Sequence, residues 1–183
     1  RGHIFNMMDP ARGPGWLPNL AEFAGRHLDF TQFVALQRQT NRGEYTVLCG
    51  DLPNLITTDS EMDIYSATAA AERTECLPAF LRRHGLATIY LQAAPITFMG
   101  KDEFLPNAGF SSVLDTKWFT KAYATSGWGV DDRAFFEQAG DLIVELEKAG
   151  DPWFLTLLTV GTHHPYLIPS EWKGRSKLGA FED

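Results

Sequence analysis

A threonine and a pair of histidines occupy positions where this sequence could support phosphate or sulfate chemistry. Thr40 precedes a stretch, 41–49, that predicts a helix, and the N–H groups at a helix N-terminus attract anions. His163 and His164 follow the strongly apolar run 153–160, which predicts a strand. In parallel sheets, chemistry gathers outside the carboxyl ends of the strands. These residues therefore indicate a site that handles phosphate or sulfate groups.

Each of these side chains also has a purely structural interpretation. Threonine is a common N-cap, so Thr40 could simply begin its helix. A histidine at a strand end can bond a backbone carbonyl, and His164 fits that role better than His163. Successive side chains on an extended strand point to opposite faces, so the two imidazoles make a poor pair of metal ligands.

The elements that must position these residues alternate along the chain. Helices are expected at 17–27, 41–49, 75–84, 98–109 and 131–149, and strands or extended runs at 30–36, 87–91 and 153–160. Residues 51–74 are polar and weakly patterned, which predicts a surface connection with room for one helical piece. The alternation predicts an α/β fold with a largely parallel sheet flanked by helices on both faces.

Three polar residues come shortly after the predicted strands. They are Thr40, Gln92 and His163. Because the carboxyl ends of parallel strands meet at the same edge of a sheet, these residues are expected to line one edge.

The composition is that of an ordinary soluble globular domain. The 183 residues are 44% hydrophobic and 21% charged, with a formal net charge of −7. The negative charge and the lack of a Lys/Arg cluster argue against general nucleic-acid binding. No apolar run approaches the roughly 20 residues that span a bilayer, and no signal peptide opens the sequence. We expect an internal piece of a longer protein.

The two cysteines, Cys49 and Cys76, are compatible with two states. They could be buried thiols of a protein in a reducing compartment. They could also form a disulfide that closes a loop of roughly 27 residues, which would stabilise the fold by about 3 kcal/mol through loop-closure entropy. The residues around them leave both states open.

Several short motifs occur in an order that resembles a known family. Thr-Asn-Arg-Gly-Glu-Tyr at 40–45 looks like the nucleophile motif of the lipoteichoic acid synthase and phosphoglycerol transferase group. That group lies within the sulfatase-like branch of the alkaline phosphatase superfamily. Further similar segments are 17–23, 76–88, 98–110, 128–136 and 152–166. The resemblance extends over nearly the whole chain and implies that residues 1–183 form a single, partial sulfatase-like catalytic domain with an incomplete α/β sheet.

The resemblance implies a transferase mechanism centred on Thr40. In this family a threonine, activated by a divalent metal that is typically Mn²⁺, attacks a phospholipid phosphodiester and carries the phosphoryl group covalently. A hydroxyl needs such activation because it is a poor nucleophile in its neutral form. Thr40 would therefore be both the nucleophile of a phosphoglycerol-type transfer and one ligand of the metal.

Three further residues are implied at the substrate. His163 corresponds to a histidine that contacts the phosphate or glycerol head group. Lys101 stands where relatives carry an arginine, so it keeps the charge but loses the bidentate fork. Arg42 could orient phosphate or metal. The alternatives are a solvated surface position for Lys101 and a solvated pair of no consequence for Arg42 and Glu44.

The sequence departs from the family pattern at the metal. Nothing before Leu17 reads as the strand that delivers the first acidic ligand, and no Asp-His dipeptide occurs in 1–183. The other ligands are therefore expected outside this chain. We expect the chain to be inactive by itself, within an intact protein that is an enzyme.

The resemblance also implies partners and a location. The donor would be the head group of phosphatidylglycerol or phosphatidylethanolamine, and the acceptor a glycan or glycolipid. Family members hold the catalytic domain outside the cytoplasmic membrane, in the periplasm or extracellular space, by membrane segments that would lie outside this chain. That oxidising setting favours the disulfide between Cys49 and Cys76.

Other functions remain open. A phosphoethanolamine transferase uses a related fold and a threonine. A sulfatase-like hydrolase needs a cysteine or serine in a C/S-x-P-x-R setting, which Cys49-Gly50-Asp51-Leu52-Pro53 does not provide. A degenerate, non-catalytic domain that binds anionic head groups would explain the missing metal ligands.

Overall fold

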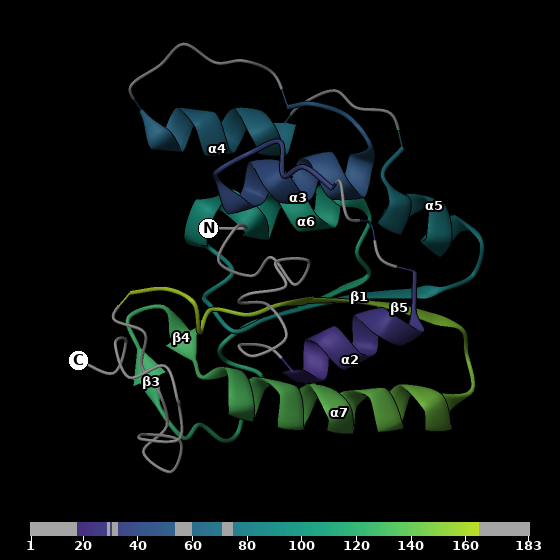
Figure 1. Ribbon diagram of the computed structural model, residues 1–183. Helices are drawn as coiled ribbons and strands as arrows, with labels where there is room; N and C mark the ends of the chain where they lie inside the picture. The colour runs from purple at the N-terminus through teal and green to yellow at the C-terminus, as the bar shows by residue number, and fades with distance from the viewer. Residues whose placement is uncertain (1–17, 29, 31–32, 54–59, 71–74, 165–183) are drawn as a thin grey trace. The chain divides into compact units, whose positions relative to one another are not determined.

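The computed structural model describes residues 18–28, 30, 33–53, 60–70 and 75–164 (Figure 1). The chain divides into two compact units, Arg1–Arg38 and Gln39–Asp183. In the first unit, α2 spans Pro18–Arg26, as the sequence predicts. Whether residues 1–183 act as one partial catalytic domain stays a prediction.

Residues 30–36 were expected to form a short strand or an extended run, and the strand is wrong for the part that the structure describes. Residues 30 and 33–36 have no regular secondary structure. Phe30, Phe33 and Val34 are strongly exposed. Aromatic and β-branched residues favour a strand only where a neighbouring strand pairs with them and buries one face.

The second unit is built on a parallel sheet with the strand order β2-β1-β5. The central strand β1, Ala87–Gln92, pairs in parallel with β2, Ser112–Leu114, and with β5, Trp153–Leu158. The strands predicted at 87–91 and 153–160 are confirmed. The predicted parallel arrangement is confirmed as well.

Side chains of β1 alternate between two hydrophobic clusters. Tyr90 packs with residues of α3 (Thr40–Cys49), α4 (Glu61–Ala70) and α6 (Lys101–Ala108). Leu91 points to the other face and packs with Phe135 of α7 (Asp132–Ala149). Figure 1 shows α3 and α6 on one side of β1 and β5, and α7 on the other. A strand buried on both faces is typical of α/β folds, and the predicted class is confirmed.

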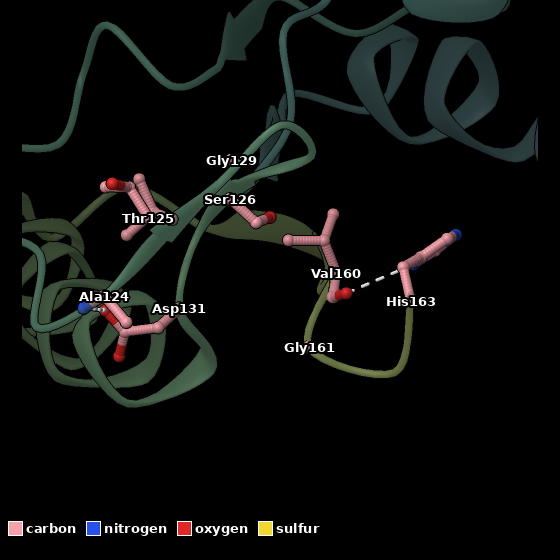
Figure 2. A pocket seen from close by; sticks show the side chains of 9 residues that line it. Ala124, Thr125, Ser126, Gly129, Asp131, Val160, Gly161 and His163 are labelled. Carbon is pink, nitrogen blue, oxygen red and sulfur yellow. Dashed lines mark hydrogen bonds between the residues drawn. The ribbon is translucent and has the colours of Figure 1, made fainter. Parts of the chain in front are cut away.

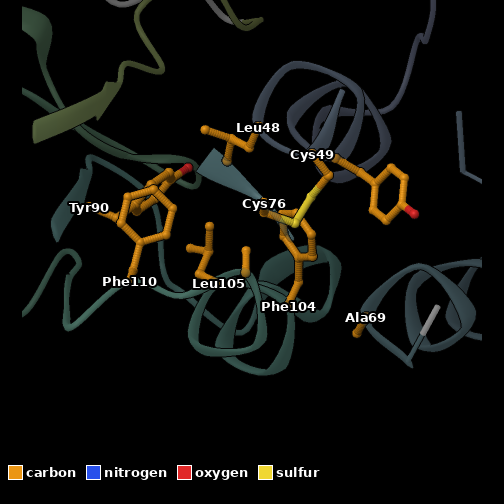
Figure 3. Close-up of a cluster of buried hydrophobic side chains, with 10 residues drawn as sticks. Leu48, Cys49, Ala69, Cys76, Tyr90, Phe104, Leu105 and Phe110 are labelled. Atoms are coloured by element: carbon orange, nitrogen blue, oxygen red, sulfur yellow. A yellow bond between two sulfur atoms is a disulfide. The ribbon is translucent and has the colours of Figure 1, made fainter. Parts of the chain in front are cut away.

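The disulfide alternative is the one that the structure contains. Cys49 is the last residue of α3, and Cys76 is the N-cap of α5 (Leu77–Arg83); their Sγ atoms are 2.06 Å apart (Figure 3). Both half-cystines belong to the buried cluster around Tyr90. The bond therefore joins the C-terminus of one helix to the N-terminus of another inside the core.

Asp131 fixes the start of α7 and the segment before it. Its Oδ1 accepts from the N–H of Ala134 at 3.0 Å, and its Oδ2 accepts from the N–H groups of Tyr123 and Ala124 at 2.7 and 2.9 Å. Burial alone would raise the pKa of Asp131, but these backbone hydrogen bonds outweigh it and lower that pKa. The helix predicted at 131–149 is confirmed.

A short ribbon lies against the chain that leaves β1. It consists of β3, Thr125–Ser126, and β4, Gly129–Val130, which pair in antiparallel fashion. Gly129 has a φ of 139°, and a Cβ there would lie 1.9 Å from the carbonyl oxygen of Ala93. Only glycine fits this approach. In the described ranges, none of the helices has the length and apolar character that a bilayer crossing requires.

Candidate functional site

Three segments meet beyond the carboxyl end of the sheet. The N–H of Val130 in β4 donates to the carbonyl of Ala93, just after β1, at 3.1 Å. The N–H of Gly161, just after β5, donates to Asp132 Oδ1 at 2.9 Å. The ends of β1 and β5, the ribbon and the start of α7 are thus joined at this edge, where parallel sheets place their sites.

Thr40 is the first residue of α3 and is partly buried. The N-cap is Gln39, with φ −81° and ψ 139°, and its side chain makes no capping hydrogen bond. The structural interpretation of Thr40 as an N-cap is therefore wrong, because the helix begins one residue earlier than the sequence predicts. Its hydroxyl is not committed to closing the helix.

The next turn of α3 begins a buried polar chain. Tyr90 donates its hydroxyl hydrogen to Glu44 Oε1, and the same hydroxyl lies 3.4 Å from Gln92 Oε1. Gln92 Nε2 donates to the carbonyl of Ala94 at 2.8 Å. Glu44 Oε2 is buried and has no hydrogen-bond partner among the described residues. Gln92 thus lies at the carboxyl end of β1, as predicted, within a network that reaches α3.

Lys101 begins α6 and is only 1% exposed. Its interpretation as a solvated surface lysine is wrong. Burial lowers the pKa of Lys101, and the charge of Glu44 opposes that change. Burial raises the pKa of Glu44, which Lys101 and the Tyr90 hydrogen bond counteract. Burial thus disfavours the charged form of each side chain, and the opposite charge of the other side chain partly offsets this effect.

Arg42 is 7% exposed, and its Nη2 donates to the carbonyl of Pro53 at 3.3 Å. The interpretation of Arg42 and Glu44 as a solvated pair is therefore wrong. The hydrogen bond fixes the chain that follows α3. A role of Arg42 at phosphate or metal stays a prediction.

His163 lines a small cavity beside the ribbon (Figure 2). Its walls are Ala124, Thr125, Ser126, Gly129, Val130, Asp131, Val160, Gly161 and His163, and its volume is about 20 Å³. That is room for about one water molecule. The cavity by itself is too small for a head group.

The backbone of Val160 sets the orientation of the His163 imidazole. The carbonyl oxygen of Val160 lies 3.1 Å from His163 Nδ1. A carbonyl only accepts, so Nδ1 carries the hydrogen, and Nε2 remains for a ligand. His163 thus bonds a backbone carbonyl, the role that the sequence favours more for His164. It fixes the ring without using Nε2.

Trp128 packs against the His163 ring. The two ring centroids are 4.6 Å apart, and Trp128 Nε1 donates to the carbonyl of His164 at 2.8 Å. Trp128 also meets Phe98 in an edge-on contact, with the ring centroids 5.5 Å apart. Phe98 opens the 3₁₀ turn η2, Phe98–Gly100, which leads into Lys101.

The turn η2 therefore connects three of the residues singled out by the sequence. Through Trp128 it is linked to His163, and it runs directly into Lys101. The carbonyl of Met99 in this turn accepts from Asn41 Nδ2, next to Thr40, at 3.1 Å. Neither Asn41 nor Trp128 stands out in the sequence as a functional residue. Both lie inside the family-like motifs, but their contacts depend on segments distant in sequence.

The sequence is similar to known proteins over most of its length. The family model described as Sulfatase matches residues 11–179. Phosphoglycerol transferase I of Xanthomonas campestris pv. campestris (strain ATCC 33913) is 32% identical over 163 residues, which cover 86% of this chain and 23% of that protein. Phosphoglycerol transferase I of Escherichia coli O127:H6 is 28% identical over 158 residues, 83% of this chain and 20% of that protein. The chain spans about a quarter of the length of these relatives.

Two solved structures share the fold. One is a protein in the alkaline phosphatase superfamily from Vibrio parahaemolyticus, with a TM-score of 0.73 and 22% identity over 90% of this chain and 40% of that one. The other is the lipoteichoic acid synthase LtaP from Listeria monocytogenes, with a TM-score of 0.64 and 21% identity over 77% of this chain and 33% of that one. Since the family model covers nearly all of the sequence and the fold agrees, this chain belongs to the Sulfatase family.

Proposed function

We propose that this chain is part of a catalytic domain that transfers a phosphoglycerol-type group from a phospholipid to a glycan or glycolipid acceptor, with Thr40 as the covalent nucleophile. The main supporting observation is the start of α3. Thr40 opens this helix without capping it, beside the turn that delivers the buried Lys101. Similarity to phosphoglycerol transferase I supports the same choice of reaction.

The reaction would proceed in two displacements. The Thr40 oxygen attacks the phosphorus of the lipid phosphodiester, the bond from phosphorus to the lipid alcohol oxygen breaks, and the hydroxyl proton leaves with that alcohol. An acceptor hydroxyl then attacks the same phosphorus, the bond from phosphorus to the Thr40 oxygen breaks, and the acceptor's proton ends on Thr40, which regains its free hydroxyl. Such covalent catalysis divides one difficult step into two easier ones.

The residues around Thr40 would stabilise the phosphoryl oxygens. The N-terminus of α3 carries the positive end of the helix dipole, which favours an anion at this position. Lys101 would add a positive charge, as a point donor instead of the two-pronged contact that arginine makes. His163 would offer Nε2, in an orientation fixed by Val160 and Trp128.

A divalent metal, Mn²⁺ in this proposal, would act as a Lewis acid on the Thr40 hydroxyl when bound. Among the described residues, no three His, Cys, Asp or Glu side chains cluster in a way that could hold a metal ion. The described residues therefore do not supply a complete set of metal ligands. Further ligands would have to come from segments outside them.

The disulfide supports a location outside the cytoplasm. Disulfides persist in oxidising compartments, and Cys49 and Cys76 form one. We therefore place this domain on the outer side of the cell membrane, attached through segments outside this chain. The same bond argues against a formylglycine-dependent sulfatase, because Cys49 is already committed to Cys76.

A non-catalytic domain that binds anionic head groups is the second candidate. The absence of a metal-ligand cluster among the described residues favours it. The two candidates make the same use of Lys101 and His163. They differ only in whether Thr40 becomes covalently modified.

The intact mass of the full-length protein after incubation with Mn²⁺ and phosphatidylglycerol separates these functions. We expect a phosphoglycerol-sized adduct that Thr40→Ala abolishes and Thr40→Ser partly retains. A phosphoethanolamine adduct, formed only from phosphatidylethanolamine, would move the assignment to that transferase. If a protein that binds manganese gives no adduct from either lipid, the transferase proposal is wrong and the binding domain takes its place.

A further inference from the structure

Met99 has a backbone conformation that its side chain disfavours. Its φ is 63° and its ψ is 28°, and within the described ranges it is the one residue other than glycine with a positive φ. Gly100 follows with a φ of 63°. Side chains with a Cβ avoid this left-handed region, so the surroundings must hold Met99 there.

Asn41 supplies that restraint. It is fully buried, and its Nδ2 donates to the Met99 carbonyl at 3.1 Å. Its Oδ1 accepts from the N–H of Arg42 at 2.8 Å, which ties the same side chain to the first turn of α3. The side-chain amide of Asn41 therefore makes two hydrogen bonds. Its oxygen bonds the first turn of α3, which begins with Thr40, and its nitrogen bonds η2.

The turn is also packed from its far side. A Cβ on Gly100 would lie 3.4 Å from Tyr65 Cβ in α4. Lys101 follows this turn directly and is 1% exposed, so its position depends on the two left-handed residues before it. A different conformation at Met99 would redirect the start of α6.

We propose that Asn41 is a positioning residue, which locks the turn at Met99 so that the Lys101 ammonium stays at a fixed place relative to Thr40. This inference rests on the proposed function, in which Thr40 and Lys101 act on one phosphate. Asn41 itself does not touch the substrate. It sets the distance between two groups that do.

The first test measures Lys101 directly and does not depend on activity. In the full-length protein, Asn41→Asp removes the donor to Met99, and Asn41→Ser removes it without adding a buried charge. We expect the Lys101 amine to react with an acetylating reagent about fivefold faster in each, the factor that one ordinary hydrogen bond represents. Peptide mass spectrometry measures the rate at every lysine. Unchanged labelling of Lys101 in Asn41→Ser would overturn the proposal.

The matched control is Asn107→Asp. Asn107 Nδ2 also donates to a distant carbonyl, that of Ala69, at 3.4 Å, but it does not touch η2. This variant should label Lys101 at the wild-type rate. If both asparagine variants label Lys101 equally fast, the effect is general loosening and the proposal fails.

Rescue separates positioning from simple stability. Glycine adopts the left-handed conformation without strain, so Met99→Gly added to Asn41→Ser should restore most of the slow labelling of Lys101. Restoration of stability without restoration of slow labelling would overturn the proposal. Asn41→Ser also decides the matter if the buried carboxylate of Asn41→Asp prevents folding.

The second test uses adduct formation from phosphatidylglycerol. In Asn41→Ser we expect the lipid concentration at half-maximal rate to rise about fivefold, with a smaller change in the rate at saturation. If only the rate at saturating lipid falls and the half-maximal concentration is unchanged, the proposal that Asn41 positions Lys101 is contradicted. If the wild-type protein forms no adduct at all, the proposed function fails, and the labelling result still decides the role of Asn41.

Discussion

At the scale of single residues, Glu44 and Lys101 determine the electrostatics of the edge. Burial disfavours the charged form of each, and each charge partly offsets that effect for the other. The folded protein therefore binds more protons at Glu44, and fewer at Lys101, than the unfolded chain does. These opposite shifts give the two residues opposite effects on the pH dependence of stability.

Glu44→Gln should remove a pH-dependent loss of stability. The pKa of Glu44 is raised above its ordinary value of 4.5, so the free energy of unfolding falls as the pH rises from that value through the folded pKa. Because glutamine does not titrate, the free energy of unfolding of the variant should not decrease over this pH range. Urea unfolding between about pH 4 and about pH 8 measures it. Asp102→Asn, at an exposed position in the first turn of α6, is the control, and parallel slopes for wild type and Glu44→Gln would refute the assignment.

Glu137 provides the reverse case on the surface. Hydrogen bonds from Tyr123, Arg133 and Lys121 lower its pKa to about 2. Its contribution to stability is therefore present above its ordinary pKa of 4.5 and is lost as the pH falls toward about 2. At neutral pH the Glu137→Gln variant should unfold at a lower temperature than the wild-type protein. In acid the unfolding temperatures of the two proteins should converge. Equal differences at both pH values would show that charge is not involved.

At the scale of elements, the ribbon is positioned by one glycine. Gly129→Ala would place a methyl group 1.9 Å from the Ala93 carbonyl oxygen, at a φ of 139° that alanine avoids. We expect destabilisation of about 3 kcal/mol or more, and loss of the Trp128 contact to His163. Gly127→Ala is the matched control, since a Cβ there meets nothing within 4 Å. Urea unfolding of both variants measures the difference, and equal stabilities would contradict the close approach.

The sequence predicts a helix or strand well where the segment itself carries the signals that define it, such as a capping residue or a continuous apolar run. The helix 131–149 has a capping aspartate and a charged C-terminal turn, and the strands 87–91 and 153–160 are apolar enough to be buried. The run 30–36 has the composition of a strand but lacks a partner in the described residues. Strand propensity depends on that partner, which a local pattern does not reveal.

The site is less predictable than the elements that carry it. Thr40, Lys101 and His163 are recognisable from their motifs. The burial of Lys101, however, depends on α3 and α4, which pack on the neighbouring turn η2 and are far from it in sequence. The left-handed Met99 leaves no local signal, because methionine is an unusual choice for it. The function of Asn41 becomes visible only with the residue it contacts.

At the scale of the whole molecule, the disulfide is the main covalent constraint on the fold. It joins residues separated by 27 positions, so replacing both cysteines by alanine should lower the free energy of unfolding by about 3 kcal/mol. Urea unfolding with and without a reductant measures this. The reductant should affect the wild-type protein and leave the Cys49→Ala, Cys76→Ala variant unchanged. A wild-type protein that is indifferent to reduction would show that the bond does not contribute.

The loop that this bond closes contains all of α4, whose residues 61–70 lie between the two half-cystines. The helix is thereby tethered at both ends, which keeps its effective concentration beside its neighbours high even when its own packing opens for a moment. Tyr65 of that helix packs against Gly100, one residue before Lys101. Closure of this loop therefore also restricts the turn before Lys101, and under the proposed function the geometry around the phosphate would depend on an oxidised Cys49–Cys76 pair.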